Sequence, residues 1–139
     1  MPATGRVLLD TNILIALLAE DPGVVRGVQD AEAVHVPAIA LGELYYGARK
    51  SARAAQNVQR VAALAAKSAV LACDATTAAT YGEIKAALRA KGTPIPENDL
   101  WIAALAKQHE LTLASRDEHF AVVPGLVRVA WTEPPSTPP

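Results

Sequence analysis

The segment that decides the fold is Arg6-Val7-Leu8-Leu9-Asp10-Thr11-Asn12. Its three consecutive aliphatic residues predict a short strand buried on both faces, as strands of parallel sheets usually are. The polar residue Asp10 ends this strand, and a helix is predicted over 11–18. Polar side chains therefore gather directly after the first strand, which is where parallel sheets place their ligands.

The remainder of the chain alternates short apolar runs with longer helical patterns. Further strands are predicted at 34–36, 69–73, 111–114 and 127–130, and further helices at 22–30, 38–50, 51–67, 74–91 and 97–110. This alternation predicts an α/β protein with a three-layer fold, in which helices flank a central parallel sheet of four to five strands. We expect one domain over residues 1–132 and a disordered, proline-rich tail over 133–139.

Local signals mark several helix ends. Asp21, followed by Pro22 and Gly23, is a predicted N-cap, and Asp74 is expected to cap the helix that ends before Gly92. The helix over 51–67 is expected to bury one apolar face. That face carries Val58, Val61, Ala62 and Leu64.

The composition is that of one ordinary globular domain. The chain has 139 residues, 51% of them hydrophobic, a formal net charge of −1 and a pI of about 6.3. A protein that coats nucleic acid non-specifically would be far more basic, although a local basic patch suffices for a nuclease. Basic residues do cluster, and they either bind phosphate or lie on solvated helix faces. The two clusters are Arg49, Lys50, Arg53 and Arg60, and Lys85, Arg89 and Lys91.

Cysteine and histidine usage narrows the chemistry. Cys73 is the single cysteine, so an intrachain disulfide is excluded, and a buried structural thiol is expected. The three histidines are scattered at positions 35, 109 and 119, which argues against a zinc site. No secretory signal is evident, and the apolar run over 13–19 is too short to span a bilayer. We expect a soluble, cytoplasmic protein without a membrane partner.

Four carboxylates stand where chemistry is usually sited, and they are Asp10, Glu43, Asp99 and Asp117. Asp10 and Asp117 follow predicted strands, whereas Glu43 and Asp99 lie on largely apolar helices. Each acid also has an ordinary alternative. Asp10 and Asp99 could simply cap helices, Glu43 could face solvent, and Asp117 could lie in a surface turn.

Among these acids, Asp99 shows the strongest indication of a functional role. Ile102, Ala103 and Ala106 follow it at helical spacing, so Asp99 shares their apolar face. A carboxylate on a buried face is unfavourable unless it is paired, hydrogen-bonded or bound to a metal. Asp99 also lies in the first turn of its helix, where free backbone N–H groups favour an anion.

Together the four acids would form an oxygen-rich pocket. Two carboxylates about 4 Å apart repel by about 4 kcal/mol at an effective dielectric constant of about 20, so four cannot all stay ionised without a counter-charge. Oxygen ligands favour Mg²⁺, for which Mn²⁺ can substitute, over Zn²⁺. Thr11, Asn12 and Ser115 would add supporting polar side chains. Three further acids rank below these four: Glu83, Glu97 and Glu118.

Four stretches of the chain carry a recognisable pattern. They are Leu8-Leu9-Asp10-Thr11-Asn12, Ile39-Ala40-Leu41-Gly42-Glu43-Leu44-Tyr45-Tyr46-Gly47, Gly92-Thr93-Pro94-Ile95-Pro96-Glu97-Asn98-Asp99-Leu100-Trp101-Ile102-Ala103-Ala104, and Ser115-Arg116-Asp117 before His119-Phe120. In this order and spacing they resemble the PIN-domain ribonucleases, and within that family the VapC-type toxins of toxin–antitoxin modules. The similarity runs from Val7 to about Val129.

The resemblance implies a PIN-like fold and a set of roles. Asp10, Glu43, Asp99 and Asp117 would be the catalytic acids, with the metal held by Asp10, Asp99 and Asp117, and Asp117 would be the most variable of the four. Many such toxins have Thr where Ser115 stands. The resemblance also implies an RNA substrate, a homodimer, and a cognate antitoxin whose extended tail lies across the site and directs an arginine at the acids.

The leading hypothesis is therefore a Mg²⁺-dependent endoribonuclease that acts as the toxin of a toxin–antitoxin pair. A metal-activated water would hydrolyse RNA and leave a 5′-phosphate and a 3′-hydroxyl, with Glu43 orienting water or a second ion. One alternative is a phosphoryl-transfer domain that forms an aspartyl-phosphate at Asp10, although one such class has a second Asp where Asn12 stands. Another alternative is an inactive PIN-like binding scaffold. The sequence does not indicate which RNA is cut.

Overall fold

The computed structural model describes residues 5–132 and contains one sheet of five parallel strands in the order β3-β2-β1-β4-β5. The strands are β1 (Arg6–Leu9), β2 (Ala33–Pro37), β3 (Ala69–Leu71), β4 (Thr112–Ala114) and β5 (Arg128–Val129). The predicted three-layer α/β architecture is confirmed. The predicted tail at 133–139 lies outside the described residues.

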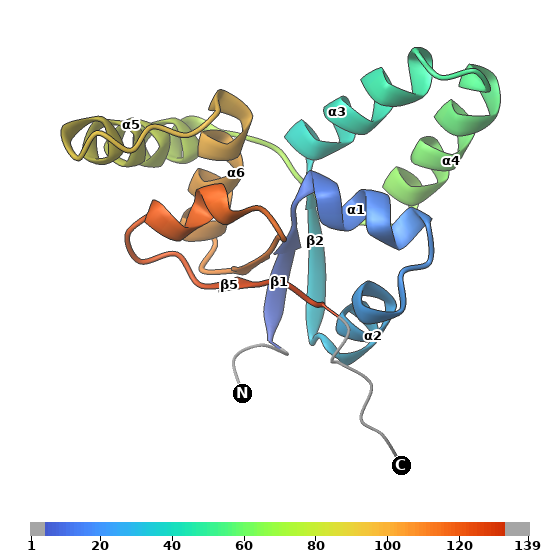
Figure 1. Ribbon diagram of the computed structural model, residues 1–139, viewed down its shortest axis with the longest axis horizontal. Coiled ribbons are helices and arrows are strands. Elements are labelled where there is room, and N and C mark those ends of the chain that lie inside the picture. The colour runs from blue at the N-terminus through green and yellow to red at the C-terminus, as the bar shows by residue number, and fades with distance from the viewer. Residues whose placement is uncertain (1–4, 133–139) are drawn as a thin grey trace.

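Six α-helices and one 3₁₀ helix surround this sheet within the described part of the chain. They are α1 (Thr11–Leu18), α2 (Pro22–Asp30), α3 (Ala38–Arg49), α4 (Ala54–Ala66), α5 (Ala75–Ala90), α6 (Glu97–Gln108) and η2 (Glu118–Val122). Figure 1 shows α1 and α2 on one side of the sheet and α6 with α5 on the other. None of the helices within residues 5–132 has the length and apolar character needed to cross a membrane.

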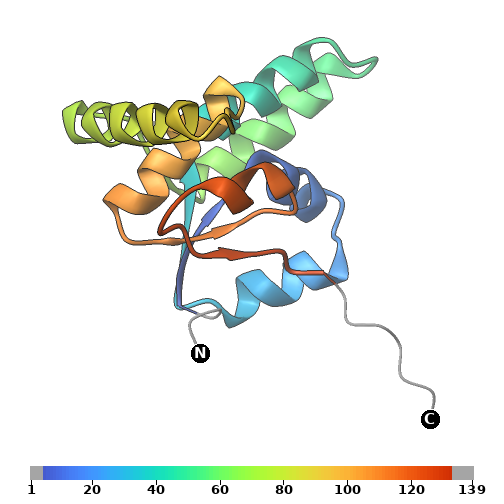
Figure 2. The ribbon, with the colours of Figure 1, turned by 60° about the vertical axis from the view of Figure 1, so that its left-hand side comes forward.

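Two helical arms extend past the carboxyl ends of the strands. One arm is the α3–α4 hairpin and the other is the packed pair α5 and α6. Figure 2 shows the same two arms after rotation, with η2 lying in front of the sheet below them. The carboxyl edge of the sheet therefore lies at the base of a hollow between two helical pairs.

The central strand β1 explains why polar residues accumulate at that edge. Its side chains Val7, Leu8 and Leu9 are fully buried, as expected for a strand covered on both faces. Leu9 pairs with Ala114 of β4, and the backbone N–H of Asp10 donates to the Ala114 carbonyl at 2.9 Å. The two residues that follow β1 and β4 are therefore held side by side.

The predicted helix caps are confirmed. The Asp21 carboxylate accepts hydrogen bonds from the backbone N–H groups of Gly23 and Val24, and Asp74 forms a reciprocal capping box with Thr77. Gly92 has a φ of +72°, the left-handed conformation that ends a helix.

The start of α4 and its apolar face differ from expectation. The helix begins at Ala54 instead of residue 51, because the Ser51 hydroxyl donates to the Ala48 carbonyl and closes a turn first. Val61 and Leu64 are buried as predicted. Ala62, by contrast, is exposed, because the face in contact with the core is narrower than the spacing suggested.

The prediction of a buried Cys73 is wrong, and the thiol is exposed. β3 is an edge strand of three residues that ends at Leu71, so Cys73 lies beyond the covered part of the sheet. The sequence suggested a strand two residues longer and thus placed this residue inside.

Candidate active site

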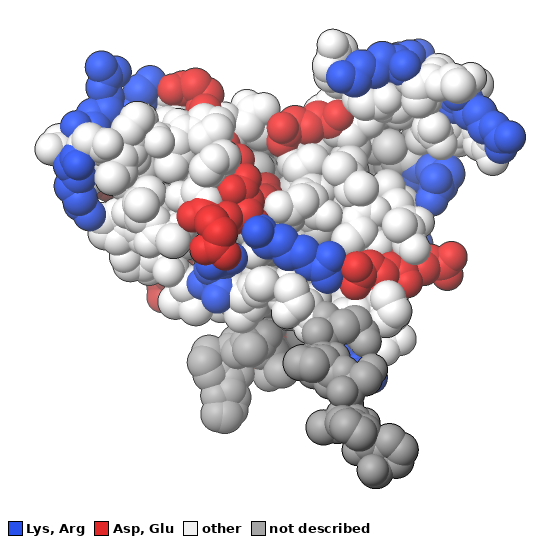
Figure 3. Space-filling model, in the orientation of Figure 1, with Lys and Arg blue, Asp and Glu red and all other residues white. Residues whose placement is uncertain are grey.

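The four predicted acids reach the carboxyl edge of the sheet from four different elements. Asp10 follows β1, Asp117 follows β4, Glu43 extends from α3, and Asp99 extends from the first turn of α6. Figure 3 shows acidic side chains gathered in the hollow between the two arms, whose outer ends carry lysine and arginine. Segments that are distant in sequence thus contribute to one acidic hollow.

Asp10 forms the floor of this hollow. The residue is 4% exposed, and the Ser115 hydroxyl donates to its Oδ2 at 2.7 Å. Its side chain makes no capping hydrogen bond to α1, so a simple helix cap does not account for it. Burial raises the pKa of Asp10 and outweighs the opposing hydrogen bond from Ser115, while the charges of Asp117 and Glu43 add to the rise.

One hydroxyl group connects two of the acids. Ser115 is fully buried, donates to Asp10 and accepts the backbone N–H of Asp117 at 3.0 Å. Because both hydrogen bonds use the same Oγ atom, the position of the Asp117 loop is fixed relative to the floor. The structure thus brings the predicted supporting residue Ser115 directly against Asp10.

Asp99, Asp117 and His119 form the tightest group of potential metal ligands in the described chain. One ligand atom of each lies within 4.8 Å of the other two. His119 Nδ1 is 3.3 Å from Asp99 Oδ2 and 3.0 Å from Asp117 Oδ1. Asp10 is not a member of this group, but its charge contributes to the titration of Asp99.

The carboxyl group of Asp99 titrates unusually. Its pKa is raised from 3.8 to about 6, and burial is the largest cause. The hydrogen bond with His119 opposes the rise, whereas the nearby charges of Asp10 and Asp117 add to it. Ile102, Ala103 and Ala106 on the same helix face are buried, as the sequence predicted. The side chain of Asp99 itself is 15% exposed.

Glu43 lies on the open side of the hollow. Its Oε1 accepts a hydrogen bond of 2.6 Å from the Thr11 hydroxyl, and the residue is exposed. Thr11 therefore orients Glu43 instead of contributing directly to the floor. Asn12, the other predicted supporting residue, accepts the Arg116 backbone N–H at 3.4 Å and so contacts the loop that carries Ser115 and Asp117.

Sequence reasoning missed the role of Arg116. Its guanidinium makes two hydrogen bonds with Asp21, at 3.0 and 3.1 Å, and also donates to the backbone carbonyls of Ala130 and Trp131. The hydrogen bonds from Arg116 are the main cause of a lowered pKa at Asp21. This fork fastens the Ser115–Asp117 loop to the start of α2 and to the end of β5.

The acids of the hollow have no lysine or arginine counter-charge. Among residues 5–132, no lysine or arginine forms an ion pair with Asp10, Glu43, Asp99 or Asp117. Two arginines that follow β4 are engaged elsewhere, Arg116 with Asp21 and Arg128 with Glu118. A set of carboxylates whose only nearby basic side chain is the imidazole of His119 among the described residues fits a divalent cation.

The three lower-ranked acids lie apart from this set. Glu97 pairs with Lys85 at 2.8 Å and accepts a hydrogen bond from Tyr81, whose ring stacks on Trp101 with 4.0 Å between centroids. Glu118 pairs with Arg128, and Glu83 is exposed. Their lower ranking agrees with this placement.

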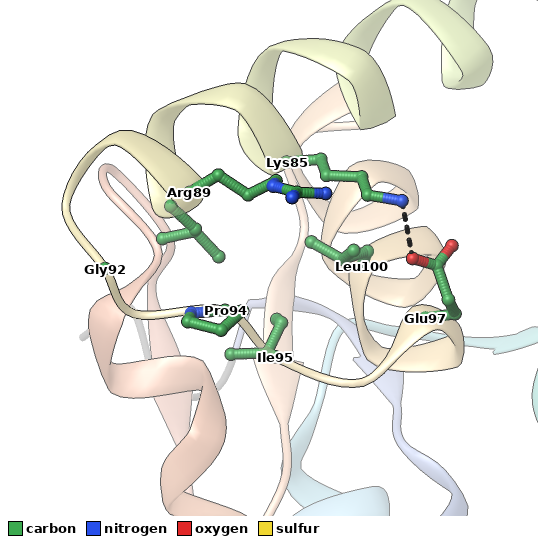
Figure 4. Close-up of a pocket in the computed structure, with 8 residues that line it drawn as sticks. Lys85, Arg89, Gly92, Pro94, Ile95, Glu97 and Leu100 are labelled. Carbon is green, nitrogen blue, oxygen red and sulfur yellow. Dashed lines mark hydrogen bonds and ion pairs between the residues drawn. The ribbon is translucent and has the colours of Figure 1, made fainter.

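A second hollow lies between α5 and the start of α6, beside the acids. Figure 4 shows the Lys85–Glu97 ion pair at one end of this hollow and Arg89 along α5. Its volume is about 420 Å³, and Leu88, Ile95 and Leu100 contribute apolar walls. It therefore combines cationic and apolar groups.

Comparison with known proteins identifies the family. The PIN domain model matches residues 7–126, and the chain belongs to this family. Within the family, the chain is similar to ribonuclease VapC2 of Haemophilus influenzae, with 36% identity over 81% of this chain and 86% of that protein. It is also 30% identical to the tRNA(fMet)-specific endonuclease VapC of Shigella flexneri, over 91% and 98% of the two chains.

The fold comparison agrees with the sequence comparison. The crystal structure of DNA-bound VapBC from Salmonella typhimurium contains a chain that matches with a TM-score of 0.85 and 29% identity. The match covers 91% of this chain and 98% of that chain. The resemblance to PIN-domain VapC toxins that the sequence motifs indicated is therefore confirmed.

Proposed function

We propose that this protein is a Mg²⁺-dependent endoribonuclease and the toxin of a toxin–antitoxin pair. The observation that carries the proposal is the convergence of four carboxylates at one sheet edge, where no lysine or arginine of residues 5–132 forms an ion pair with them. A scaffold without catalytic function has no need for a buried, uncompensated Asp10, since such a group is costly. The relatives named as ribonucleases and endonucleases support the same conclusion.

The cation would be held by Asp10, Asp99 and Asp117. When bound, it would lower the pKa of a coordinated water and offset the negative charge of the scissile phosphate. Ser115 holds two of these acids in position through its single hydroxyl. Glu43, which Thr11 orients, lies on the open side of the hollow and is placed to orient the attacking water.

The reaction is the hydrolysis of an RNA phosphodiester bond. The water oxygen bonds to phosphorus and the bond from phosphorus to the 3′-oxygen breaks, so that the products carry a 5′-phosphate and a 3′-hydroxyl. The reaction requires no cysteine or histidine nucleophile. This agrees with the exposed position of Cys73, outside the acidic hollow.

RNA would reach the acids across the two arms. The arm ends carry exposed basic residues, Lys50 and Arg53 on one and Arg89 and Lys91 on the other. Two other members of the basic clusters are engaged within the chain, because Arg60 donates to the Leu18 carbonyl and Lys85 pairs with Glu97. The phosphate backbone thus meets positive charge on both sides of the acidic hollow.

An apolar groove beside Glu43 is the proposed docking site of the antitoxin. It lies between α1 and the α3–α4 hairpin, has a volume of about 400 Å³, and leaves Ile15 55% exposed. Leu18, Leu44 and Val61 also line it. A partner segment in this groove would reach Glu43 at its end and place an arginine on the acids. Structures titled as VapBC complexes support such a partner, and we also expect a homodimer.

The test is RNA cleavage by the purified protein in Mg²⁺, with parallel assays of Asp10→Asn and Asp99→Asn. We expect the wild type to cleave RNA and to leave 5′-phosphate ends. A chelator should stop this cleavage, and neither variant should cleave. Undiminished cleavage by Asp10→Asn would refute the assignment. Correctly folded wild type without cleavage or saturable Mn²⁺ binding would favour the inactive scaffold, and a trapped aspartyl-phosphate at Asp10 would favour phosphoryl transfer.

A further inference from the structure

His119 lies against two of the acids of the hollow. We infer that His119 is a nitrogen ligand of the divalent cation, and that it shifts the preference of the site from Mg²⁺ toward Mn²⁺. This inference rests on the metal site of the proposed function. It adds to that site a residue type and a selectivity that four carboxylates alone would not have.

The distances around His119 are those of neighbouring ligands on one ion. Its Nδ1 lies 3.3 Å from Asp99 Oδ2 and 3.0 Å from Asp117 Oδ1. Adjacent ligands of an octahedral ion with bonds of about 2.1 Å are separated by about 3.0 Å. The two distances from Nδ1 are therefore close to this separation, and all three ligand atoms lie within 4.8 Å of one another.

Hydrogen bonds and core packing fix the backbone of His119. The Asp117 carboxylate accepts the His119 backbone N–H at 2.9 Å, and the Asp117 N–H donates to the buried Ser115 hydroxyl. The next residue, Phe120, is 1% exposed and anchors the turn in the core. Backbone and core contacts thus fix the base of His119, while its ring contacts only the two carboxylates among the polar side chains of the described residues.

The ring itself has no structural task in the core. Its side chain is 55% exposed, and its contacts with polar side chains are those with Asp99 and Asp117. The other histidines differ, because both ring nitrogens of His35 are buried without a hydrogen-bond partner and His109 ends α6. Among the three, His119 alone is positioned beside the carboxylates.

The ligand chemistry explains the expected selectivity. Mg²⁺ is a hard ion that takes oxygen ligands and retains water, whereas an imidazole nitrogen suits first-row transition ions better. Two carboxylates and one imidazole form a mixed donor set. The alternative is that His119 only forms an ion pair with the acids, in which case no nitrogen would bind the metal.

Pulsed electron paramagnetic resonance of the Mn²⁺-loaded full chain separates these two cases. We expect nitrogen modulation from a histidine ligand in the wild type, altered when histidine is labelled with ¹⁵N. The modulation should disappear in His119→Gln and persist in His109→Gln, a matched control on the far end of α6. His119→Ala gives a second variant if the first does not fold.

Calorimetric titration measures the selectivity. His119→Gln should weaken Mn²⁺ binding by about tenfold while Mg²⁺ binding changes by less than about twofold. Equal losses of affinity for Mn²⁺ and Mg²⁺ in His119→Gln would overturn the inference. So would Mn²⁺ binding that depends on Asp99 but shows no nitrogen modulation. Either result would leave the proposed function intact. Wild-type protein that binds no Mn²⁺ would overturn both.

Discussion

The floor of the acidic hollow and its rim hold their polar groups in different ways. At the floor, Asp10 and Ser115 are 4% and 0% exposed and follow two adjacent strands. At the rim, Asp117 and His119 side chains are 31% and 55% exposed and lie on a loop and a 3₁₀ turn. A buried group has no water to replace a lost partner, so the floor should tolerate changes far less than the rim.

The strongest test of this contrast is Asp10→Asn. We expect RNA cleavage, measured as kcat/KM in Mg²⁺, to fall by about 1,000-fold or more, because the amide removes a charged oxygen ligand from the floor. Without metal, the free energy of unfolding should stay equal or rise, since a neutral group is easier to bury.

Asp30→Asn is the matched control, because Asp30 is exposed at the end of α2. It should change neither cleavage nor stability. Similar losses of cleavage in both variants would show that the floor has no special role. A marked loss of metal-free stability in Asp10→Asn would show that the carboxylate is structural.

Ser115→Ala tests the hydroxyl that joins floor and rim. The change leaves Asp10 Oδ2 and the Asp117 N–H without their common partner. We expect Mn²⁺ affinity, measured by calorimetry, to fall by about 10- to 100-fold, as is typical when a group supporting a ligand is removed. Ser115→Thr keeps the hydroxyl and should stay within about threefold of wild type. Equal affinity of all three proteins would contradict this role.

The titration of Asp99 predicts a pH dependence at the boundary between floor and rim. Its pKa is raised from 3.8 to about 6, so the metal-free folded state favours the protonated form. The contribution of Asp99 to the free energy of unfolding is fully present below its ordinary pKa of 3.8, and it is lost as the pH rises through about 6. Asp99→Asn should flatten the thermal unfolding profile of metal-free protein in this range.

Metal binding should show the opposite slope, because protons compete with the ion for Asp99. Mn²⁺ affinity should rise with pH and level off above about 6, with a loss of about tenfold per pH unit below that value. Calorimetric titrations from about pH 5 to 7.5 measure this slope. A flat profile would show that Asp99 is not a ligand.

Glu43→Gln probes the open side of the rim. The amide oxygen still accepts the Thr11 hydroxyl, so the change removes charge while the geometry stays. We expect kcat to fall by about tenfold with little change in Mn²⁺ affinity, a smaller effect than at Asp10. A loss as large as that of Asp10→Asn would show that exposure does not separate the two regions.

The smallest effects are expected at the ends of the two arms. Lys50→Ala and Arg89→Ala should each raise KM for RNA by about threefold and reduce the slope of log KM against log salt by about 0.7. Both side chains are exposed, so neither change should affect stability. An effect of only one variant would show that RNA contacts one arm.

Strands, caps and the convergence of the acids could be predicted from the sequence because they depend on local patterns. The run Val7-Leu8-Leu9 specifies a strand buried on both faces, and a parallel sheet then places Asp10 at its carboxyl edge. The sequence indicates a functional role for Asp99 because its neighbours on the same helix face are apolar. These signals lie within a few residues of the groups that they concern.

The remaining features depend on contacts between distant segments. Arg116 and Asp21 are 95 positions apart, and nothing in either local sequence indicates their pairing. His119 could have been noticed, because it lies two residues after Asp117, but its contact with Asp99 requires the tertiary fold. The exposed Cys73 follows from the position of β3 at the sheet edge, which the chain order does not reveal.

The Arg116 fork makes the position of the Ser115–Asp117 loop depend on residues close to the end of the described chain. The backbone carbonyls of Ala130 and Trp131 accept two of its hydrogen bonds. A protein shortened after Val129 would retain all five strands and the four acids of the hollow. It would nevertheless lose half of the tether that immobilises the loop of Ser115 and Asp117, so trimming at this end should loosen the nuclease centre before it unfolds the sheet.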